Sequence, residues 1–588
     1  MQNRNFRLAA KWCIAVSGCL FGLVAALYAA MFVVLLLRLP VTRMTLSLGL
    51  LVMAAAVAAF AIWRLRRGAP GGSLWLRGGS ALLISAICAA VSVYSAGVIY
   101  DTSYDGQVYH YFAVLQLQSG WNPIYDPMGI DLIWVNHYPK GVWFIAAAIY
   151  TLTGFAETGK AVNVIVMASS FFAALAVLLA VFSAERKGEA FSGLSALSRG
   201  SAAVLIAASA AMNPVTSMQL FTYYNDGIIG SLLLLLAAAL AYFTYTYERR
   251  ALWLSAGAVV LLINVKFTAI AYAGILCATM VAAVAIRLWL ENKDGSMQGG
   301  EGGVKARLLA VLKARAMWRP ITVLLATAAV AVVVIGWNPY VFNTVKQGHP
   351  FYPLAGKGAL DIMTVNSPAD FHNHTRWYKF AVSYTSKTED VIAPNVTHRS
   401  AWWPIDWRQF ANLNVDTRIA GFGPLSRWLL VLTPALGLLI VMLRWRVGVV
   451  AAFAGAGLLA SVFINPEPWW ARYVPQLWLV PLVFVAAAWR ARQWLLRGAG
   501  AAVLAMCFIS AYLCADISIG RAYKQSQEVK AQLQDMQGKQ VALFSEAFKA
   551  PAQRMKEWGI DYREVKKEDL RCKQPVTAAY AASLLCIE

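Results

Sequence analysis

Long apolar runs alternate with short polar segments along most of this chain. Runs such as 12–37, 48–62 and 228–243 carry almost no charge over about the length that a helix needs to cross a bilayer. The pattern therefore predicts an all-α polytopic membrane protein with about thirteen transmembrane helices. Their expected ranges are 12–37, 44–64, 78–99, 160–183, 200–214, 226–246, 251–265, 268–290, 319–338, 426–444, 447–464, 473–490 and 496–515.

Lysine and arginine residues gather in alternate connections between these runs. The basic clusters lie at 4–11, 64–67, 186–199, 249–250, 287–319, 444–446 and 490–497. Because such residues mark the cytoplasmic ends of spanning helices, their alternation predicts an N-in, C-out chain. It also requires that the apolar stretch 142–155 does not span. That stretch has about 14 residues, a length typical of an interfacial or re-entrant helix.

The predicted spans divide the chain into four parts. These are two N-terminal helices (1–77), a transmembrane module (78–490), a last spanning helix (491–515) and a periplasmic tail (516–588). Two outer loops, 100–159 and 338–425, are too long to be mere connectors, so both are candidates for function. Within the tail, a strand–helix–strand pattern over 541–565 predicts a small α/β appendage.

Composition excludes several classes of protein. Only 14% of the 588 residues are charged and 59% are hydrophobic, whereas soluble proteins carry about 25% charged residues. A cytosolic enzyme, a secreted disulfide scaffold and a disordered regulator are thus excluded. The net charge is 51 − 29 = +22. We expect no nucleic-acid partner, because many of the basic residues sit in short loops where they fix orientation.

Two of the eight cysteines stand apart from the rest. Cys572 and Cys586 lie in the hydrophilic tail, whereas the other six lie in apolar runs and are most simply packing residues. A tail that faces the oxidising periplasm would allow these two cysteines to form a disulfide. One missed or surplus helix would instead leave both thiols free in the cytoplasm.

Ionisable residues at the outer ends of the predicted helices are the candidates for chemistry. Asp101 and Asp105 follow the third helix, Asp226 begins the sixth, Lys266 lies in a short outer turn, and Arg472 precedes the twelfth. Cations could hold a phosphate as it leaves, while a carboxylate takes a proton from an attacking hydroxyl. The alternative is that these charges are ordinary helix ends facing water, with Asp226 as an N-cap.

The stretch DGQVYHYFAVLQLQSGW, which begins at Asp105, resembles a loop of known membrane enzymes. It is similar to the outer loop of the C-type (GT-C) superfamily of integral-membrane glycosyltransferases, in particular the lipid A aminoarabinose transferase and protein mannosyltransferase branches. There an acidic residue opens the loop, a tyrosine follows four residues on and a Ser-Gly-Trp turn ends the helix. Here these positions are Asp105, Tyr109 and 119–121.

Further matches follow in order over residues 78–490. The stretch from His137 through Lys140 to 155 resembles the family's proline-led interfacial helix. Asp226, Lys266 and Arg472 resemble the acidic, lysine and arginine positions of the core. One departure concerns metal use: many relatives have a second acidic residue directly after the first, where this chain has Gly106.

The resemblance implies an inverting single displacement at the anomeric carbon of a sugar. Asp105 would be the general base, and Lys266 and Arg472 would bind the donor phosphate. The candidate substrate- or metal-binding residues are Asp101, Tyr109, His110, Asp226, His137 and Lys140. For the two histidines the alternative is a role as hydrogen-bonded structural residues. No cofactor is assigned, although two carboxylates and a histidine near an outer loop could bind a divalent metal.

We therefore expect a multi-pass protein of the bacterial inner (cytoplasmic) membrane with its active site facing the periplasm. Its expected partners are an undecaprenyl- or other polyprenyl-phosphate sugar donor, membrane lipids and an envelope glycan, lipid or protein acceptor. The alternative is a transporter or flippase of lipid-linked glycans without transferase activity. A transporter needs polar residues near the bilayer midplane, and the apolar runs contain few.

Overall fold

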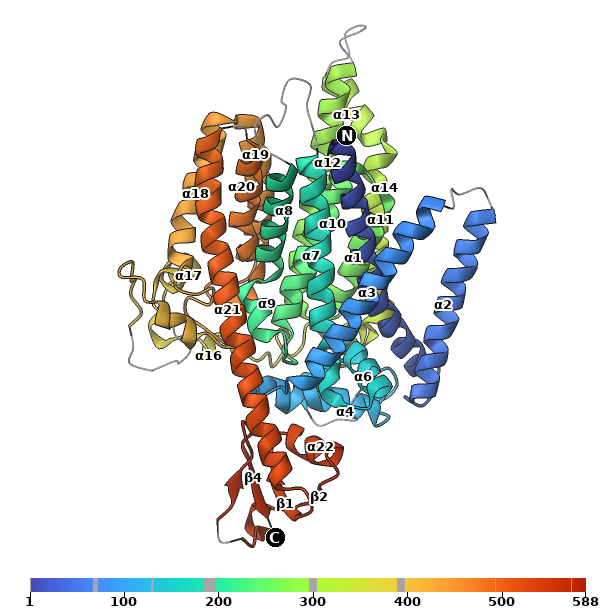
Figure 1. Cartoon of the computed structure of the whole chain (residues 1–588), viewed down its shortest axis with the longest axis vertical. Helices are drawn as coiled ribbons and strands as arrows, with labels where there is room; N and C mark the ends of the chain where they lie inside the picture. Colours follow the sequence, from blue (N-terminus) through green and yellow to red (C-terminus); the bar gives the residue numbers. More distant parts are fainter. Residues whose placement is uncertain are drawn as a thin grey trace.

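The structure is a computed structural model that describes residues 2–66, 72–127, 132–183, 196–295, 304–388, 397–491, 493–572 and 574–587. A bundle of long helices occupies most of its height, and a small sheet lies beyond one end (Figure 1). At the centre α1 packs against α7, and α10 packs against α7 and α11. The α-helices are α1 (Gln2–Leu36), α2 (Arg43–Arg66), α3 (Gly72–Val98), α4 (Tyr111–Gln118), α5 (Ile133–His137), α6 (Gly141–Thr153), α7 (Ala161–Phe182), α8 (Ala196–Ala211), α9 (Pro214–Gln219), α10 (Asp226–Thr246), α11 (Arg249–Ile263), α12 (Phe267–Gly295), α13 (Val304–Lys313), α14 (Arg315–Val330), α15 (Phe342–Gln347), α16 (Ile362–Val365), α17 (Arg376–Thr385), α18 (Ser426–Leu443), α19 (Trp445–Phe463), α20 (Leu479–Arg490), α21 (Trp494–Asp535) and α22 (Ala550–Glu557).

Nine helices among the described residues are long and apolar enough to cross a membrane, and the chain is a multi-pass membrane protein by this measure. The sequence predicted thirteen. The other four predicted segments are also helical and correspond to α2, α8, α11 and the stretch Pro475–Arg490. The prediction is therefore confirmed for nine long spans, and the remaining four predicted segments are helical.

The short helix α8 shows how a local signal interrupts an apolar run. The sequence Asn213-Pro214 follows α8 directly, and the Asn213 side chain accepts a hydrogen bond from the backbone N of Val215 at 3.0 Å. This is the arrangement of an N-cap residue with proline at the first helical position, so a second helix, α9, begins here. The predicted span 200–214 is therefore divided between α8 and the start of α9.

Helix α6 corresponds to the apolar stretch that we expected not to span. Its 13 residues give a length of about 20 Å, short of the roughly 30 Å hydrocarbon core. The helix ends at Gly154, whose φ of +81° suits a left-handed C-terminal cap. It lies near the sheet end of the bundle, beside α4 (Figure 1), and is almost wholly buried.

Basic residues gather at the opposite end of the bundle, near the N-terminus. Lys11 Nζ lies 3.2 Å from Glu248 Oε1. Arg287 Nη1 donates to the carbonyl of Tyr245 at 3.0 Å, and Arg490 Nη1 to that of Val181 at 2.7 Å. This end is the one farther from the C-terminal sheet (Figure 1). Other members of the predicted basic clusters, namely Arg67, Arg186, Lys187 and Arg492, lie outside the described residues.

The tail forms a four-stranded sheet with one helix, which confirms the predicted small α/β appendage. The strand order is β2-β1-β4-β3, where β1 (Gln540–Ser545) pairs parallel to β2 (Asp561–Glu564) and antiparallel to β4 (Ser583–Ile587), and β4 pairs with β3 (Val576–Thr577). Cys586 of β4 is disulfide-bonded to Cys572, with Cα atoms 5.7 Å apart.

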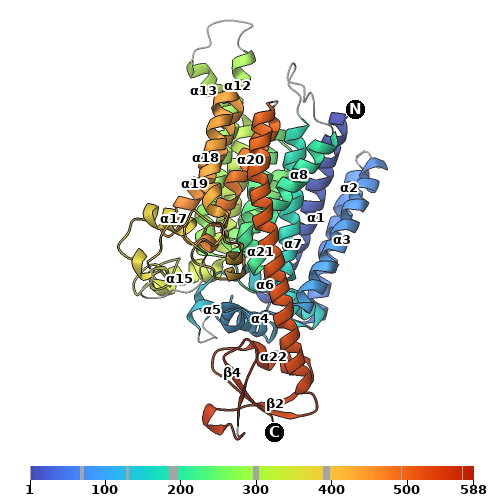
Figure 2. The same ribbon diagram turned by 60° about the vertical axis from the view of Figure 1, so that its left-hand side comes forward.

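A single helix joins the bundle to this sheet. Helix α21 has 42 residues, hence a length of about 63 Å, roughly twice the hydrocarbon thickness. Figure 2 shows it running along the bundle and continuing past α4 to the sheet. The second half of α21 thus holds the sheet against the outer loops.

Candidate active site

The loop after α3 carries two aspartates with different surroundings. The carboxylate of Asp101 is buried and accepts hydrogen bonds from the backbone N atoms of Ser103 (2.9 Å) and Tyr223 (2.7 Å). Burial raises the pKa of this carboxyl, against the opposing effect of nearby Lys160. Asp101 thus ties two chain segments together, and the structure places it apart from the ionisable residues described next.

Gly106 leaves room for the buried Asp101 carboxylate. A Cβ atom at Gly106 would lie 2.2 Å from the Asp101 carboxylate oxygen Oδ2 and 2.2 Å from Ser103 Oγ. Both contacts are far inside van der Waals distance, so a side chain here would displace Asp101. The Asp101 carboxylate, from four positions upstream of Asp105, takes part of the space that a side chain at position 106 would need.

Four predicted residues, distant in sequence, come together at the sheet end of the bundle. Arg472 lies at their centre: its Nε is 3.1 Å from Asp226 Oδ2, and its Nη2 is 4.0 Å from Asp105 Oδ2. Lys266 Nζ lies 2.5 Å from the other oxygen of Asp226. We call Asp105, Asp226, Lys266 and Arg472 the charge cluster.

Each member of the charge cluster stands where a regular element begins or ends. Asp226 is the first residue of α10, where the positive end of the helix dipole stabilises a carboxylate. Lys266 immediately precedes α12, and Arg472 lies in the short 3-10 helix η8 (Ala471–Tyr473). Asp105 precedes the π-helical turn η1 (Gly106–His110). Asp226 and Arg472 therefore lie within regular elements, whereas Asp105 and Lys266 directly precede one.

A fifth charged residue, Asp416, was missed by sequence reasoning. Its Oδ1 accepts a hydrogen bond from Arg472 Nη1, and its Oδ2 lies 3.7 Å from Arg418 Nη2. Asp416 comes from the second outer loop, in a segment without secondary-structure periodicity, so no pattern related it to Arg472. With Arg418 included, three cations face three carboxylates.

Aromatic rings surround the two cations of the charge cluster. The Arg472 guanidinium carbon lies 5.0 Å from the ring centroid of Trp470, 5.2 Å from that of Tyr224 and 5.1 Å from that of Tyr473. Lys266 Nζ lies 4.5 Å from the Tyr473 ring centroid. Such contacts stabilise a cation without neutralising its charge.

The carboxylates differ in how much solvent they meet. The Asp105 side chain is 27% exposed and that of Asp416 is 29% exposed, whereas that of Asp226 is only 5% exposed. Burial raises the pKa of Asp105 above its ordinary value although Arg472 opposes this, and the nearby charge of Asp226 raises it further. A carboxylate with a raised pKa is a stronger base. Asp105 is thus both reachable and suited to accept a proton.

His110 and Tyr109 lie beside the charge cluster in a group of aromatic rings that contact one another at tilted and edge-on angles. His110 Nδ1 accepts a hydrogen bond from Trp143 Nε1 at 2.8 Å, and its ring centroid lies 4.2 Å from that of Tyr109. Burial lowers the pKa of His110 to about 3, so the imidazole is neutral at physiological pH. These contacts agree with the structural interpretation of His110.

His137 and Lys140 connect the two outer loops. His137 Nδ1 lies 2.7 Å from Asn343 Oδ1. The Lys140 ammonium donates to the carbonyls of Asn136 (2.9 Å) and Tyr138 (2.8 Å) and to Asn338 Oδ1 (2.7 Å). All three of its protons meet neutral acceptors, and burial lowers its pKa well below the ordinary value. The structure places both side chains in this loop junction, with different partners from those of the charge cluster.

Two further features concern ligands. Across the part of the chain that the structure describes, no three His, Cys, Asp or Glu side chains form a group able to hold a metal ion.

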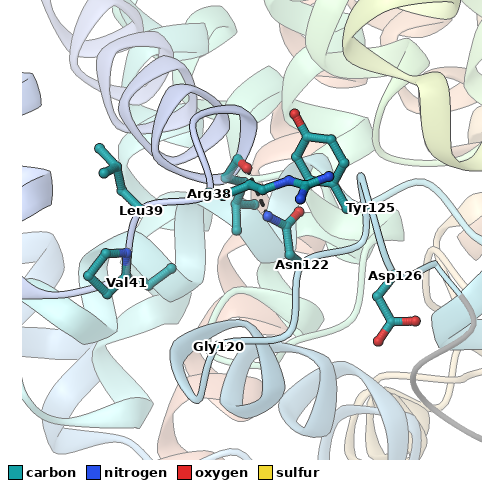
Figure 3. A pocket seen from close by; sticks show the side chains of 9 residues that line it. Arg38, Leu39, Val41, Gly120, Asn122, Tyr125 and Asp126 are labelled. Carbon is teal, nitrogen blue, oxygen red and sulfur yellow. Dashed lines mark hydrogen bonds between the residues drawn. The ribbon is translucent and has the colours of Figure 1, made fainter.

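A cavity of about 530 Å³ lies where α1 ends (Figure 3). Asn122 Nδ2 and Tyr125 Oη cap α1 there by donating to the carbonyls of Leu35 and Leu36, and the Arg38 guanidinium lies 4.0 Å above the Tyr125 ring. None of its lining residues belongs to the charge cluster.

Comparison of the chain with known family models, curated proteins and solved structures finds no match. The charge cluster itself is therefore the basis for any functional argument.

Proposed function

We propose that the chain is a glycosyltransferase that moves a sugar from a polyprenyl-phosphate donor to a hydroxyl of an envelope glycan, lipid or protein. One observation carries the proposal: Asp105, a partly exposed base, lies 4.0 Å from Arg472, which with Lys266 forms a pair of cations at the same end of the bundle. Basic loops at the opposite end support an orientation with this site facing the periplasm.

In the proposed reaction the acceptor hydroxyl attacks the anomeric carbon of the donor sugar. The new carbon–oxygen bond forms as the bond to the phosphate oxygen breaks, with inversion at the carbon. The hydroxyl proton passes to the Asp105 carboxylate, which needs to lie within hydrogen-bond reach of it. The polyprenyl phosphate leaves with its bonding electron pair.

Arg472 and Lys266 stabilise the charge that develops on the departing phosphate. Both are paired with Asp226 at distances of 3.1 and 2.5 Å, which fixes their positions before the donor arrives. Preorganised cations of this kind stabilise a transition state without reorganisation at the moment of reaction. Asp226 is thereby a positioning residue, and Asp105 is the catalytic base.

The test compares Asp105→Asn with the wild type, using purified protein and a radiolabelled polyprenyl-phosphate sugar. We expect turnover to fall by about 10²-fold or more with donor affinity retained, because the amide keeps the shape and cannot accept the proton. The matched control is Asp126→Asn, an exposed aspartate on the same outer loop.

Equal activity of Asp105→Asn and the wild type would remove Asp105 from the mechanism. If no candidate donor yields product with any acceptor while reconstituted protein moves the lipid across vesicles, the chain is a transporter and the enzyme proposal is lost.

A further inference from the structure

The C-terminal unit, defined as β1–β4 together with α22, contacts the loop that carries Asp105. We infer that Arg554 of α22 is a positioning residue, which holds this loop in the geometry that Asp105 needs to accept a proton. The inference rests on the proposed function, since it concerns the same site. It gives the tail a part in turnover beyond anchoring the end of the chain.

Arg554 is the centre of a buried ionic array at the junction of tail and bundle. Its side chain is 2% exposed, and Nε and Nη2 lie 3.0 and 2.7 Å from Glu157 Oε1. The other Glu157 oxygen accepts hydrogen bonds from Lys160 Nζ and, at 3.0 Å, from the backbone N of Asp101. Moving α22 away from the bundle would leave Glu157 and Arg554 buried without each other, which costs free energy. This ion pair therefore fixes α22 against the bundle.

The same guanidinium contacts the Asp105 loop on both sides of the aspartate. Arg554 Nη2 donates to the carbonyl of Asp101 at 2.6 Å, and Nη1 donates to Gln107 Oε1 at 3.3 Å. Gln107 in turn donates to the carbonyl of Tyr580 at 2.7 Å, just before β4. Asp105 therefore lies between two residues held by one side chain of the tail.

These contacts matter because the Asp105 side chain is itself partly exposed and lies 4.0 Å from Arg472. That separation is set by where the backbone at 101–107 runs. A displacement of about 1 Å at a catalytic group can lower the rate by about 10²-fold. Loss of the Arg554 contacts should thus lower kcat while leaving the cations that bind the donor in place.

The experiment uses the full-length protein with Arg554→Met, Arg554→Lys and the control Lys556→Met. Lys556 is exposed on the same helix, so its loss removes a positive charge from α22 without touching the loop. For each variant and the wild type we would measure kcat, the KM for the donor and the rate of hydrogen exchange of the backbone amides of residues 102–110. We expect Arg554→Met to lower kcat by about 10²-fold, to change donor KM by less than about threefold, and to accelerate exchange.

The conservative and control variants separate positioning from general destabilisation. Arg554→Lys keeps the positive charge beside Glu157 and should restore part of kcat, while Lys556→Met should match the wild type. Wild-type kcat in a folded Arg554→Met protein overturns the inference, as does a loss of kcat with unchanged exchange at 102–110. A raised KM with unchanged kcat overturns it too.

Two further arms cover the remaining outcomes. Should Arg554→Met not fold, Gln107→Met removes the side-chain hydrogen bonds to the tail and spares the ion pair with Glu157; wild-type kcat and exchange in that variant overturn the inference. If the wild type transfers no sugar, the proposed function fails and hydrogen exchange alone decides the inference. Faster exchange at 102–110 in Arg554→Met than in Lys556→Met then still supports the role of Arg554 in holding the loop, and equal exchange overturns it.

Discussion

Glu557 offers a test of the interface between the tail and the bundle that does not depend on the reaction. Its Oε1 accepts hydrogen bonds from the backbone N of Ala156 and from Gln553 Nε2, both at 2.8 Å. Its Oε2 is buried with no hydrogen-bond partner among the described residues. Burial raises the pKa of this carboxyl from its ordinary 4.5 to about 7, while both hydrogen bonds and Arg554 oppose the rise.

The raised pKa has a defined sign for stability. Between pH 4.5 and about 7 the folded protein holds a proton that the unfolded chain has released, so the free energy of unfolding falls as pH rises. At 1.36 kcal/mol per pKa unit, this group alone removes about 3 kcal/mol by pH 8. Below pH 4.5 the two states hold the proton equally and the loss disappears.

The perturbation is Glu557→Gln, which is neutral at every pH and keeps an oxygen for Ala156. Thermal melting of the purified protein at pH 5, 6, 7 and 8 should show a Tm gain over the wild type that is small at pH 5 and grows toward pH 8. Glu568→Gln, an exposed glutamate of the same tail, is the control and should leave the pH profile unchanged. Parallel profiles for Glu557→Gln and the wild type would refute the reasoning.

Three further predictions concern the site and the tail. Gly106→Ala should lower Tm and turnover, because its Cβ would lie 2.2 Å from both the Asp101 carboxylate and Ser103 Oγ; an unchanged Tm would refute the clash. Lys266→Ala should weaken donor binding by about tenfold in titrations, with Lys266→Arg closer to the wild type, whereas unchanged affinity with a lower Tm would assign an anchoring role. Replacing Cys572 and Cys586 with serine should lower the free energy of unfolding of the tail by about 3 kcal/mol. Reductant should then lower the Tm of the wild type but not that of the serine variant, and a wild-type Tm that does not change with reductant would contradict this.

The charge cluster was predictable because three of its members stand at helix ends. Asp226, Lys266 and Arg472 each adjoin an apolar run, and ends on one side of a membrane must lie at one level. Their mutual contacts were not predictable from spacing, and neither was the pairing of Lys266 with Asp226. Asp416 was missed because a long aperiodic loop gives no register against which to place a residue.

The differences between expectation and structure have one origin, which is tertiary context. Asp101 was grouped with Asp105 because they are close in sequence, yet its carboxylate folds over Gly106 and bonds to Tyr223. The predicted span 200–214 is divided between two helices, and the reason is visible in the Asn213-Pro214 cap. In the tail the pattern indicated β1, α22 and β2, whereas β4 pairs with β1 from 38 or more residues away, beyond the reach of local periodicity.

The continuous helix α21 links the bundle, both outer loops and the C-terminal sheet. Its outer half donates from Arg521 to the carbonyl of Leu413 at 2.6 Å, and its Ser526 accepts from the backbone N of Tyr100 at 2.8 Å, so one rod touches both outer loops before it reaches the sheet. The outer half of α21 is about 30 Å long, so a tilt of about 5° moves its far end by nearly 3 Å. A tilt of α21 would therefore displace both loops and the sheet together.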